Sequence, residues 1–281
     1  MITGTIRSFA NAICYPWNAW QCLPAVVRKR INHSLATHNW SECNRALLQR
    51  VSTKISPHDL MYSSDRQHYF YSGSAGARCV EAAVNEADLP PPRTVLDLPC
   101  GHGRILRFMK LLYPEAALTA CDLDRGGVDF CRDHLGVEGL YSQHDLRSFS
   151  LNQTFDLICC FSLVTHLPAP MTLEALRFFH RHLRPGGLLV LTTLGPAALN
   201  WRNLVRSLTI RADRDEQILE SFEQCGYGYA DYLGQHNYGL SFISKAWMDA
   251  NLPASGDWQL CHFREGGWIG AQDVYGLVRR A

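Results

Sequence analysis

Glycines and carboxylates stand at spacings that suit a nucleotide-like ligand. The segment TVLDLPCGHGRIL, residues 94–106, joins an apolar run to Gly101 and Gly103 and then to a helical pattern. Glycines at the carboxyl end of a parallel strand let a ligand approach the backbone closely. Asp122 follows Gly101 by 21 residues and ends the next apolar run, where a carboxylate can accept hydrogen bonds from ribose hydroxyls. Asp124 is the alternative acceptor.

A third acidic residue and a missing glycine narrow the choice of ligand. Asp145 follows the third expected strand, where its carboxylate could reach the exocyclic amine of an adenine ring. Leu106 stands where a dinucleotide-binding GxGxxG turn has its third glycine. We therefore interpret residues 95–145 as a site for an adenosine-containing cofactor. An NAD(P)-dependent oxidoreductase is the alternative from another enzyme class.

Apolar runs alternate with helical patterns through the middle of the chain, which predicts parallel strands with crossover helices. Strands are expected at Thr94–Leu98, Ala117–Cys121, Phe155–Phe161 and Leu188–Thr193, and helices at Ala75–Ala87, Arg104–Leu112, Gly127–His134 and Met171–His182. Pro185, Gly186 and Gly187 are expected to turn the chain between the last of these helices and strands. Farther on come a helical stretch at Asp213–Gln224, a Gly- and Tyr-rich segment at Gly226–Gly239, and strand-like runs at Trp258–Phe263 and Gln272–Arg279. The short loop between the last two runs predicts an antiparallel hairpin.

Several strings between Val95 and Thr193 carry a family resemblance. VLDLPCGHGRIL, ACDLD, QHDL, FDLICCFSLVTHL and HLRPGGLLVLTT resemble the successive motifs of class I S-adenosylmethionine-dependent methyltransferases. The resemblance implies an α/β, Rossmann-like, seven-stranded and mostly parallel sheet with an antiparallel terminal hairpin. SLVTHLP, TTLG, NYGLSFIS and GWIGAQDVY resemble a bacterial subgroup often encoded near glycosyltransferases.

The resemblance also implies how S-adenosyl-L-methionine, and its product S-adenosyl-L-homocysteine, would be bound. Its parts are assigned as follows: Asp97, Pro99, Cys100, Gly101 and Gly103 to methionine, Asp122 and Leu123 to ribose, Asp145 and Leu146 to adenine, and Phe161 and Ser162 to the sulfonium. Pro99 and Cys100 depart from the small residues that many relatives carry at these two positions.

Methyl transfer depends mainly on aiming an acceptor atom at the methyl group. Alignment can supply about 7 to 11 kcal/mol, whereas a positioned base adds about 10²- to 10⁴-fold in rate. His166, just past the fourth strand, is the candidate base for a hydroxyl acceptor, with a pocket-wall role as the alternative. A hydroxyl is favoured over an amine for this reason. Tyr69, Tyr71 and Tyr238 are expected to line the acceptor pocket with His166.

The remaining aromatic and histidine residues permit simpler interpretations. Tyr227, Tyr229 and Tyr232 suit either core packing or the pocket wall. His102 is expected to pack or to meet solvent. His180 and His182 lie two positions apart on a helix and face different sides, so they cannot hold a metal jointly. We expect no catalytic metal.

Composition and charge indicate a folded globular protein whose partners are small molecules. The chain has 281 residues, 47% hydrophobic and 19% charged, with a formal net charge of +1. This charge gives no overall field for nucleic acid, so a small-molecule acceptor is expected. Eleven cysteines without paired CxxC motifs suit the reducing cytoplasm.

Residues 1–60 precede the alternating strand and helix patterns and carry none of the motifs described above. We predict a helical appendage or lid at residues 1–60 and the methyltransferase domain at residues 61–281. Trp17, Trp20 and Val26 precede a basic triplet, but a packed helix is favoured over membrane contact. A binding module that keeps the cofactor without turnover is a third function to be tested.

Overall fold

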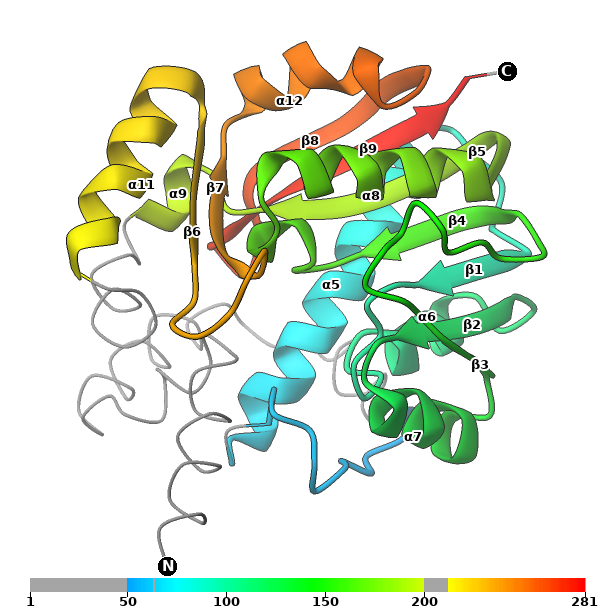
Figure 1. Ribbon diagram of the computed structural model, residues 1–281. Helices are drawn as coiled ribbons and strands as arrows, with labels where there is room; N and C mark the ends of the chain where they lie inside the picture. The colour runs from blue at the N-terminus through cyan, green and yellow to red at the C-terminus, as the bar shows by residue number, and fades with distance from the viewer. Residues whose placement is uncertain (1–49, 63, 200–211, 281) are drawn as a thin grey trace, which may run out of the picture.

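A seven-stranded sheet forms the centre of the computed structural model, which describes residues 50–62, 64–199 and 212–280. Its strand order is β3-β2-β1-β4-β5-β9-β8 (Figure 1). The strands are β1 (Thr94–Asp97), β2 (Ala117–Asp122), β3 (Glu138–Tyr141), β4 (Phe155–Cys160), β5 (Leu183–Thr193), β8 (Trp258–Trp268) and β9 (Gln272–Arg279). The first five are parallel, and β9 runs antiparallel to both β5 and β8. The predicted sheet and its terminal hairpin are thus confirmed.

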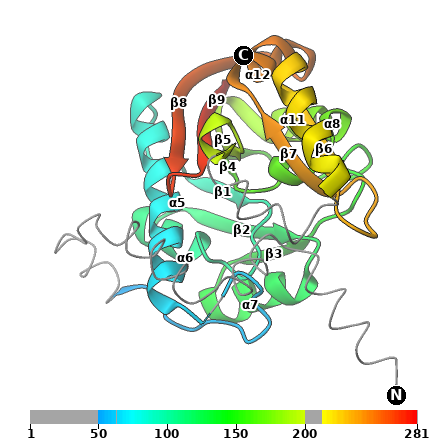
Figure 2. The same cartoon turned by 90° about the vertical axis from the view of Figure 1, so that its left-hand side faces the viewer.

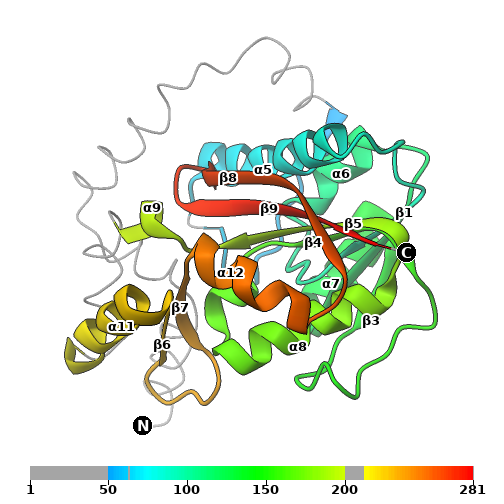
Figure 3. The ribbon, with the colours of Figure 1, turned by 90° about the horizontal axis from the view of Figure 1, so that it is seen from above.

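Helices cover both faces of this sheet (Figures 2 and 3). One face packs against α5 (Arg66–Glu86), α6 (Leu106–Leu112) and α7 (Arg125–Leu135), and the other against α8 (Ala169–His182) and α12 (Lys245–Asn251). Successive strand residues point to opposite faces, so Leu157 joins the first core and Ile158 the second. Both faces of the central strands are apolar for this reason, as buried parallel sheets require.

A smaller unit stands beside the carboxyl ends of β4 and β5 (Figure 1). It contains α9 (Pro196–Leu199), α11 (Ala212–Cys225) and the antiparallel pair β6 (Tyr227–Asp231) and β7 (Gly239–Ile243). A Cβ on Gly228 would lie 2.1 Å from the carbonyl oxygen of Ile218, so glycine lets β6 approach α11 closely. No sheet was predicted for this Gly- and Tyr-rich segment. Its glycines allow close contacts with distant residues, such as Ile218, and the sequence does not reveal these contacts.

Several element boundaries differ from the expected ones. Helix α5 begins at Arg66 and not at Ala75, because the carboxylate of Asp65 caps it by accepting from the backbone N–H of His68 at 2.9 Å. Strand β5 already begins at Leu183, directly after α8, with a shift in its pairing to β4 before Leu157.

Part of the predicted appendage can be compared with the structure. Residues 51–62 form turns, and Val51 is buried in the core of the first face. Trp17, Trp20 and Val26 lie outside the described residues. Within residues 50–62, 64–199 and 212–280, no helix combines the length and apolar character needed to cross a membrane.

Candidate functional site

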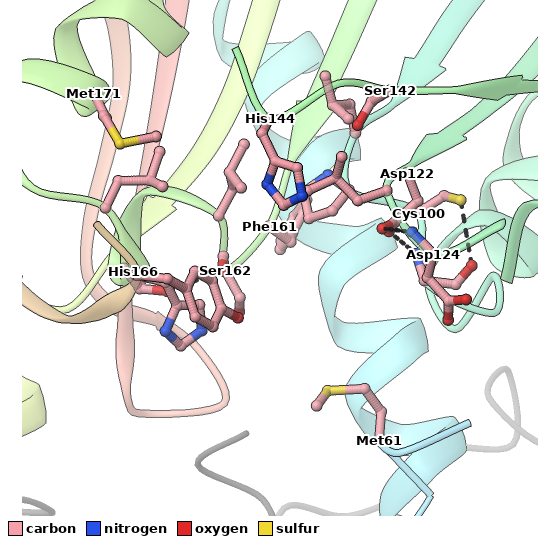
Figure 4. Close-up of a pocket in the computed structure, with 18 of the residues that line it drawn as sticks. Met61, Cys100, Asp122, Asp124, Ser142, His144, Phe161, Ser162, His166 and Met171 are labelled. Carbon is pink, nitrogen blue, oxygen red and sulfur yellow. Dashed lines mark hydrogen bonds between the residues drawn. The ribbon is translucent and has the colours of Figure 1, made fainter. Parts of the chain in front are cut away.

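A large cavity opens at the carboxyl ends of the parallel strands. Its volume is about 1340 Å³, whereas pockets for one small ligand span about 300 to 1,000 Å³. Asp122, Cys100 and Asp124 lie on one side of this cavity, and Ser162 and His166 lie on the other (Figure 4). The cavity therefore has room for a cofactor and a second molecule.

The glycine turn after β1 presents bare backbone to the cavity. Gly101 has φ of 50°, and a Cβ placed on it would meet no atom within 4 Å. Gly103 also has a positive φ, but a Cβ there would lie 2.5 Å from Cδ1 of Leu135 in α7. Gly103 thus serves helix packing and is not among the residues of the described cavity wall, and its contact with the methionine part of the cofactor stays a prediction.

Asp122 connects the end of β2 to this turn. Its Oδ2 accepts from the backbone N–H of Gly101 at 2.7 Å, and its Oδ1 accepts from that of Asp124 at 2.9 Å. Burial raises the pKa of Asp122, while these backbone donors oppose the rise. Asp124 instead caps α7 by accepting from the N–H of Gly126 at 3.0 Å. Of the two acids, Asp122 is therefore the better placed to accept from a ligand.

Buried ionisable groups lie beneath the turn. Asp97 is 2% exposed, and its burial, followed by the nearby charge of Asp122, raises its pKa. The guanidinium of Arg104 opposes this rise and lies 5.3 Å from the ring of Trp268. A hydrogen bond with Cys131 and burial raise the pKa of the Cys100 thiol, so this cysteine stays protonated. Asp97, Cys100 and Pro99 line the cavity as expected.

The far end of the cavity contains the predicted adenine contacts. Asp145 and Leu146 line it, but both oxygens of Asp145 already accept from Arg147, at 2.9 and 3.1 Å. These hydrogen bonds lower the pKa of Asp145. Ser142 and His144 also line the cavity, and neither was predicted from the sequence. Their place directly after β3 was the only available signal.

Phe161 and Ser162 form the middle of the wall. The Phe161 ring is buried and packs edge-on against Trp268, with ring centroids 5.1 Å apart. Ser162 has φ of 60°, in the left-handed region, and its N–H donates to Oγ1 of Thr192 at 2.9 Å. Such conformations cost energy outside glycine and cluster at functional sites.

His166 is held by the β6–β7 hairpin. It lies in the short 3-10 helix η1 (Val164–His166), with Nδ1 3.0 Å from the carbonyl oxygen of Gly239. The hydroxyl oxygen of Tyr232 lies 2.9 Å from the same nitrogen and can accept as well as donate. Because the carbonyl oxygen can only accept, a hydrogen on Nδ1 suits both neighbours and leaves Nε2 with its lone pair. Burial lowers the pKa of His166 to about 4, and the imidazole is therefore neutral at pH 7.

Only one of the three tyrosines expected in the acceptor pocket lines the cavity. Tyr238 lies in the wall, 5.3 Å from His166 between ring centroids. Tyr69 is 1% exposed, and its hydroxyl donates to Oδ2 of Asp59 at 2.6 Å. Tyr71, on the same helix, is also absent from the described cavity wall. The structure thus places neither Tyr69, which α5 buries, nor the half-buried Tyr71 in the described cavity wall, and their contact with the acceptor stays a prediction.

Tyr227, His180 and His182 have structural roles, whereas His102 also lines the cavity. The hydroxyl of Tyr227 donates to the carbonyl oxygen of Leu167 at 2.7 Å, in the core. His102 is buried, with its ring centroid 5.8 Å from that of Phe130. Nε2 of His182 accepts from Leu151 and that of His180 from Asp257. No group of three His, Cys, Asp or Glu side chains suited to a metal occurs in the described part of the chain.

The comparisons with known proteins agree with this geometry. Residues 95–187 match the family model of the methyltransferase domain. The chain thus carries a methyltransferase domain, and its seven-stranded sheet is that of the class I S-adenosylmethionine-dependent methyltransferases. This match disfavours the oxidoreductase alternative.

Individual relatives match only part of their length. A malonyl-[acyl-carrier protein] O-methyltransferase of Anoxybacillus flavithermus is 30% identical over 106 residues, 37% of this chain and 40% of that protein. A trans-aconitate 2-methyltransferase of Azoarcus is 30% identical over 128 residues, 45% of this chain and 49% of that protein. The chain thus spans less than half the length of each.

A solved structure supports the fold. The CcbJ methyltransferase from Streptomyces caelestis is 16% identical, with a TM-score of 0.52, and the alignment covers 75% of this chain and 95% of that one.

Proposed function

We propose that this protein transfers a methyl group from S-adenosylmethionine to a hydroxyl group of a small polar acceptor. The observation that carries the proposal is the pairing of Gly101 and Asp122: bare backbone facing the cavity, tied at 2.7 Å to a carboxylate in the same wall. Such a turn accepts a ligand at close range and offers its ribose an acceptor. The large cavity leaves space beyond it.

The residues present fit this cofactor. Asp122 would accept from the ribose hydroxyls, and the exposed side chain of Leu123 would contact the adenosine. Asp145 would accept a hydrogen bond from the adenine amine in addition to those from Arg147, because each carboxylate oxygen can accept more than one. Asp97 and the Gly101 backbone would hold the methionine part. When bound, the cofactor supplies a methyl group already activated by the sulfonium.

The acceptor would be oriented by His166. Its Nε2 can accept the proton of a hydroxyl, because Gly239 keeps the hydrogen on Nδ1. A pKa near 4 makes this imidazole a weak base, so we assign it mainly to orientation, the larger effect in methyl transfer. A neutral imidazole that accepts from a hydroxyl also favours oxygen over a protonated amine.

We also propose that residues 1–60 form an appendage beside a catalytic domain at 61–281. Asp59 and Leu60, at the end of that segment, line the cavity together with Met61. A segment that borders the cavity is suitably placed to exclude water from the transfer.

Two measurements test the activity. Calorimetry should show binding of S-adenosylhomocysteine and no binding of NADH. Incubation with methyl-labelled cofactor and a small-molecule extract of the source cells should then give a labelled product that resists alkali, because methyl ethers resist it and methyl esters release methanol. Cofactor binding without any transferred label would favour the non-catalytic module, and alkali-labile label would point to a carboxylate acceptor.

A further inference from the structure

Two polar side chains from distant parts of the chain meet in the cavity wall. Ser162 follows β4, and Gln272 is the first residue of β9, 110 positions later. Nε2 of Gln272 donates to Oγ of Ser162 at 2.9 Å, and the Ser162 hydroxyl donates in turn to Oε1 of Gln272 at the longer distance of 3.3 Å. Both residues line the cavity, so the pair faces the space beyond the proposed cofactor site.

The backbone around Ser162 fixes this pair. With φ of 60°, Ser162 adopts a left-handed conformation that is unfavourable for a residue other than glycine. Its N–H donates to Oγ1 of Thr192, and its carbonyl oxygen accepts from Oγ1 of Thr165 at 3.0 Å. The backbone N–H and carbonyl oxygen of Ser162 are therefore both bonded, and this fixes the position from which its hydroxyl reaches the cavity.

The pair has the hydrogen-bonding character of a hydroxyl site. A ligand can replace the longer of these two hydrogen bonds: the Ser162 hydroxyl then turns to donate to the ligand, and the Gln272 carbonyl oxygen accepts from it, while Nε2 still donates to Ser162. Rotating the amide by half a turn exchanges these roles and again leaves one donor and one acceptor. A hydroxyl group both donates and accepts, whereas a carboxylate only accepts and an ammonium only donates. The pair matches the hydroxyl.

The surroundings favour an uncharged ligand. His166 belongs to the same turn, since its backbone N–H donates to the carbonyl oxygen of Leu163 at 3.0 Å. Figure 4 shows Ser162 beside the His166 side chain. Leu240 and Phe242 lie in β7, which contacts η1, and both are buried residues of the cavity wall. Burial already keeps His166 uncharged, and the same low polarity disfavours a charged acceptor.

We propose that Ser162 and Gln272 bind a second hydroxyl of the acceptor, next to the hydroxyl that His166 orients. The acceptor is then a vicinal diol, a class that includes sugar rings. This inference rests on the proposed function and names the substrate class of the same site. Gln272 and Ser162 are specificity-determining residues in this view.

Periodate provides a direct test, because it cleaves the carbon–carbon bond between neighbouring hydroxyls. One half of the extract is oxidised, and the excess reagent is consumed with ethylene glycol before enzyme and labelled cofactor are added. The other half receives reagent that has already been consumed. Cleavage turns both hydroxyls of the diol into carbonyl groups, so the hydroxyl that accepts the methyl group is itself lost, and we expect oxidation to abolish nearly all of the enzyme-dependent label. Undiminished label after oxidation would overturn the diol assignment.

Variants test the residues themselves. Gln272→Leu should raise about tenfold the extract concentration that gives half-maximal labelling, with affinity for S-adenosylhomocysteine changed less than about twofold. Gln259→Leu is the matched control, because Gln259 is exposed on the neighbouring strand β8. Ser162→Ala and Ser162→Gly distinguish the effect of the hydroxyl group from that of the backbone conformation. Both variants lose the contact with Gln272, but only glycine adopts the positive φ without strain.

The outcomes separate the two proposals. If both Ser162 variants transfer label as wild type does, or if Gln272→Leu behaves like Gln259→Leu, the acceptor inference fails while methyl transfer stands. If the untreated extract yields no label although S-adenosylhomocysteine binds, methyl transfer itself is wrong, and the acceptor inference falls with it.

Discussion

Gly127 in α7 should be the most sensitive support of the cofactor turn. A Cβ on this residue would lie 2.5 Å from the carbonyl oxygen of Gly101 and 2.8 Å from its carbonyl carbon. Ordinary contacts begin near about 3.5 Å, so Gly127→Ala must move the turn by roughly 1 Å. The hydrogen bond from Gly101 N–H to Asp122, now 2.7 Å long, would then exceed the usual limit of about 3.2 Å.

Three effects determine how much Gly127→Ala lowers the free energy of unfolding. Overpacking costs about 1 to 3 kcal/mol, and losing a hydrogen bond to a carboxylate costs about 1.5 to 3 kcal/mol. The gain in helix propensity returns up to about 1 kcal/mol. Gly127→Ala should therefore lower the free energy of unfolding by about 1.5 to 5 kcal/mol. Affinity for S-adenosylhomocysteine should fall about ten- to a hundred-fold, because the displaced turn is the proposed binding surface.

Gly126→Ala is the matched control on the same helix. Gly126 is exposed, and a Cβ there would meet only Oδ1 of Asp124, at 3.3 Å. This exposed carboxylate can shift slightly, so the variant should be as stable as wild type or up to about 1 kcal/mol more stable. Urea unfolding and calorimetry measure both quantities. Equal stability and equal affinity in the Gly126→Ala and Gly127→Ala variants would refute the reasoning.

Three further predictions concern single side chains. Asp122→Ala should weaken S-adenosylhomocysteine binding about ten- to a hundred-fold, whereas Asp124→Ala should cost only its helix cap, about 1 kcal/mol of stability; a larger affinity loss for Asp124→Ala in calorimetry would exchange their roles. Burial holds the pKa of His166 at about 4, so between pH 6.5 and 4 the unfolded chain takes up a proton that the folded one does not. Stability should fall on acidification by up to about 1.4 kcal/mol per pH unit, and urea unfolding of His166→Gln should show a shallower slope. Gly195→Ala would place a Cβ 1.9 Å from Oδ2 of Asp273, so thermal unfolding should show a loss of about 1 to 3 kcal/mol, and unchanged stability would contradict this packing.

Local patterns determined the central sheet and the cofactor turn in advance. The alternation of apolar runs and helical patterns predicted the parallel strands, and the short connection after Phe263 predicted the antiparallel hairpin. Gly101 and Asp122 could be placed because Gly101 lies in the turn after β1 and Asp122 ends β2, and the carboxyl ends of neighbouring parallel strands meet. Periodicity and turn chemistry are properties of short segments, so a sequence displays them without its fold.

Contacts between distant segments were decided only by the tertiary structure. Gly103 and Gly101 are two residues apart, yet one faces α7 and the other the cavity. Tyr69 turned from the expected pocket to Asp59, since packing of α5 sets its direction. Ser162 and Gln272 meet across 110 positions. Which side chains line one cavity depends on how whole helices and strands pack together. Sequence patterns with a period of two to four residues describe only neighbouring positions and do not indicate these distant contacts.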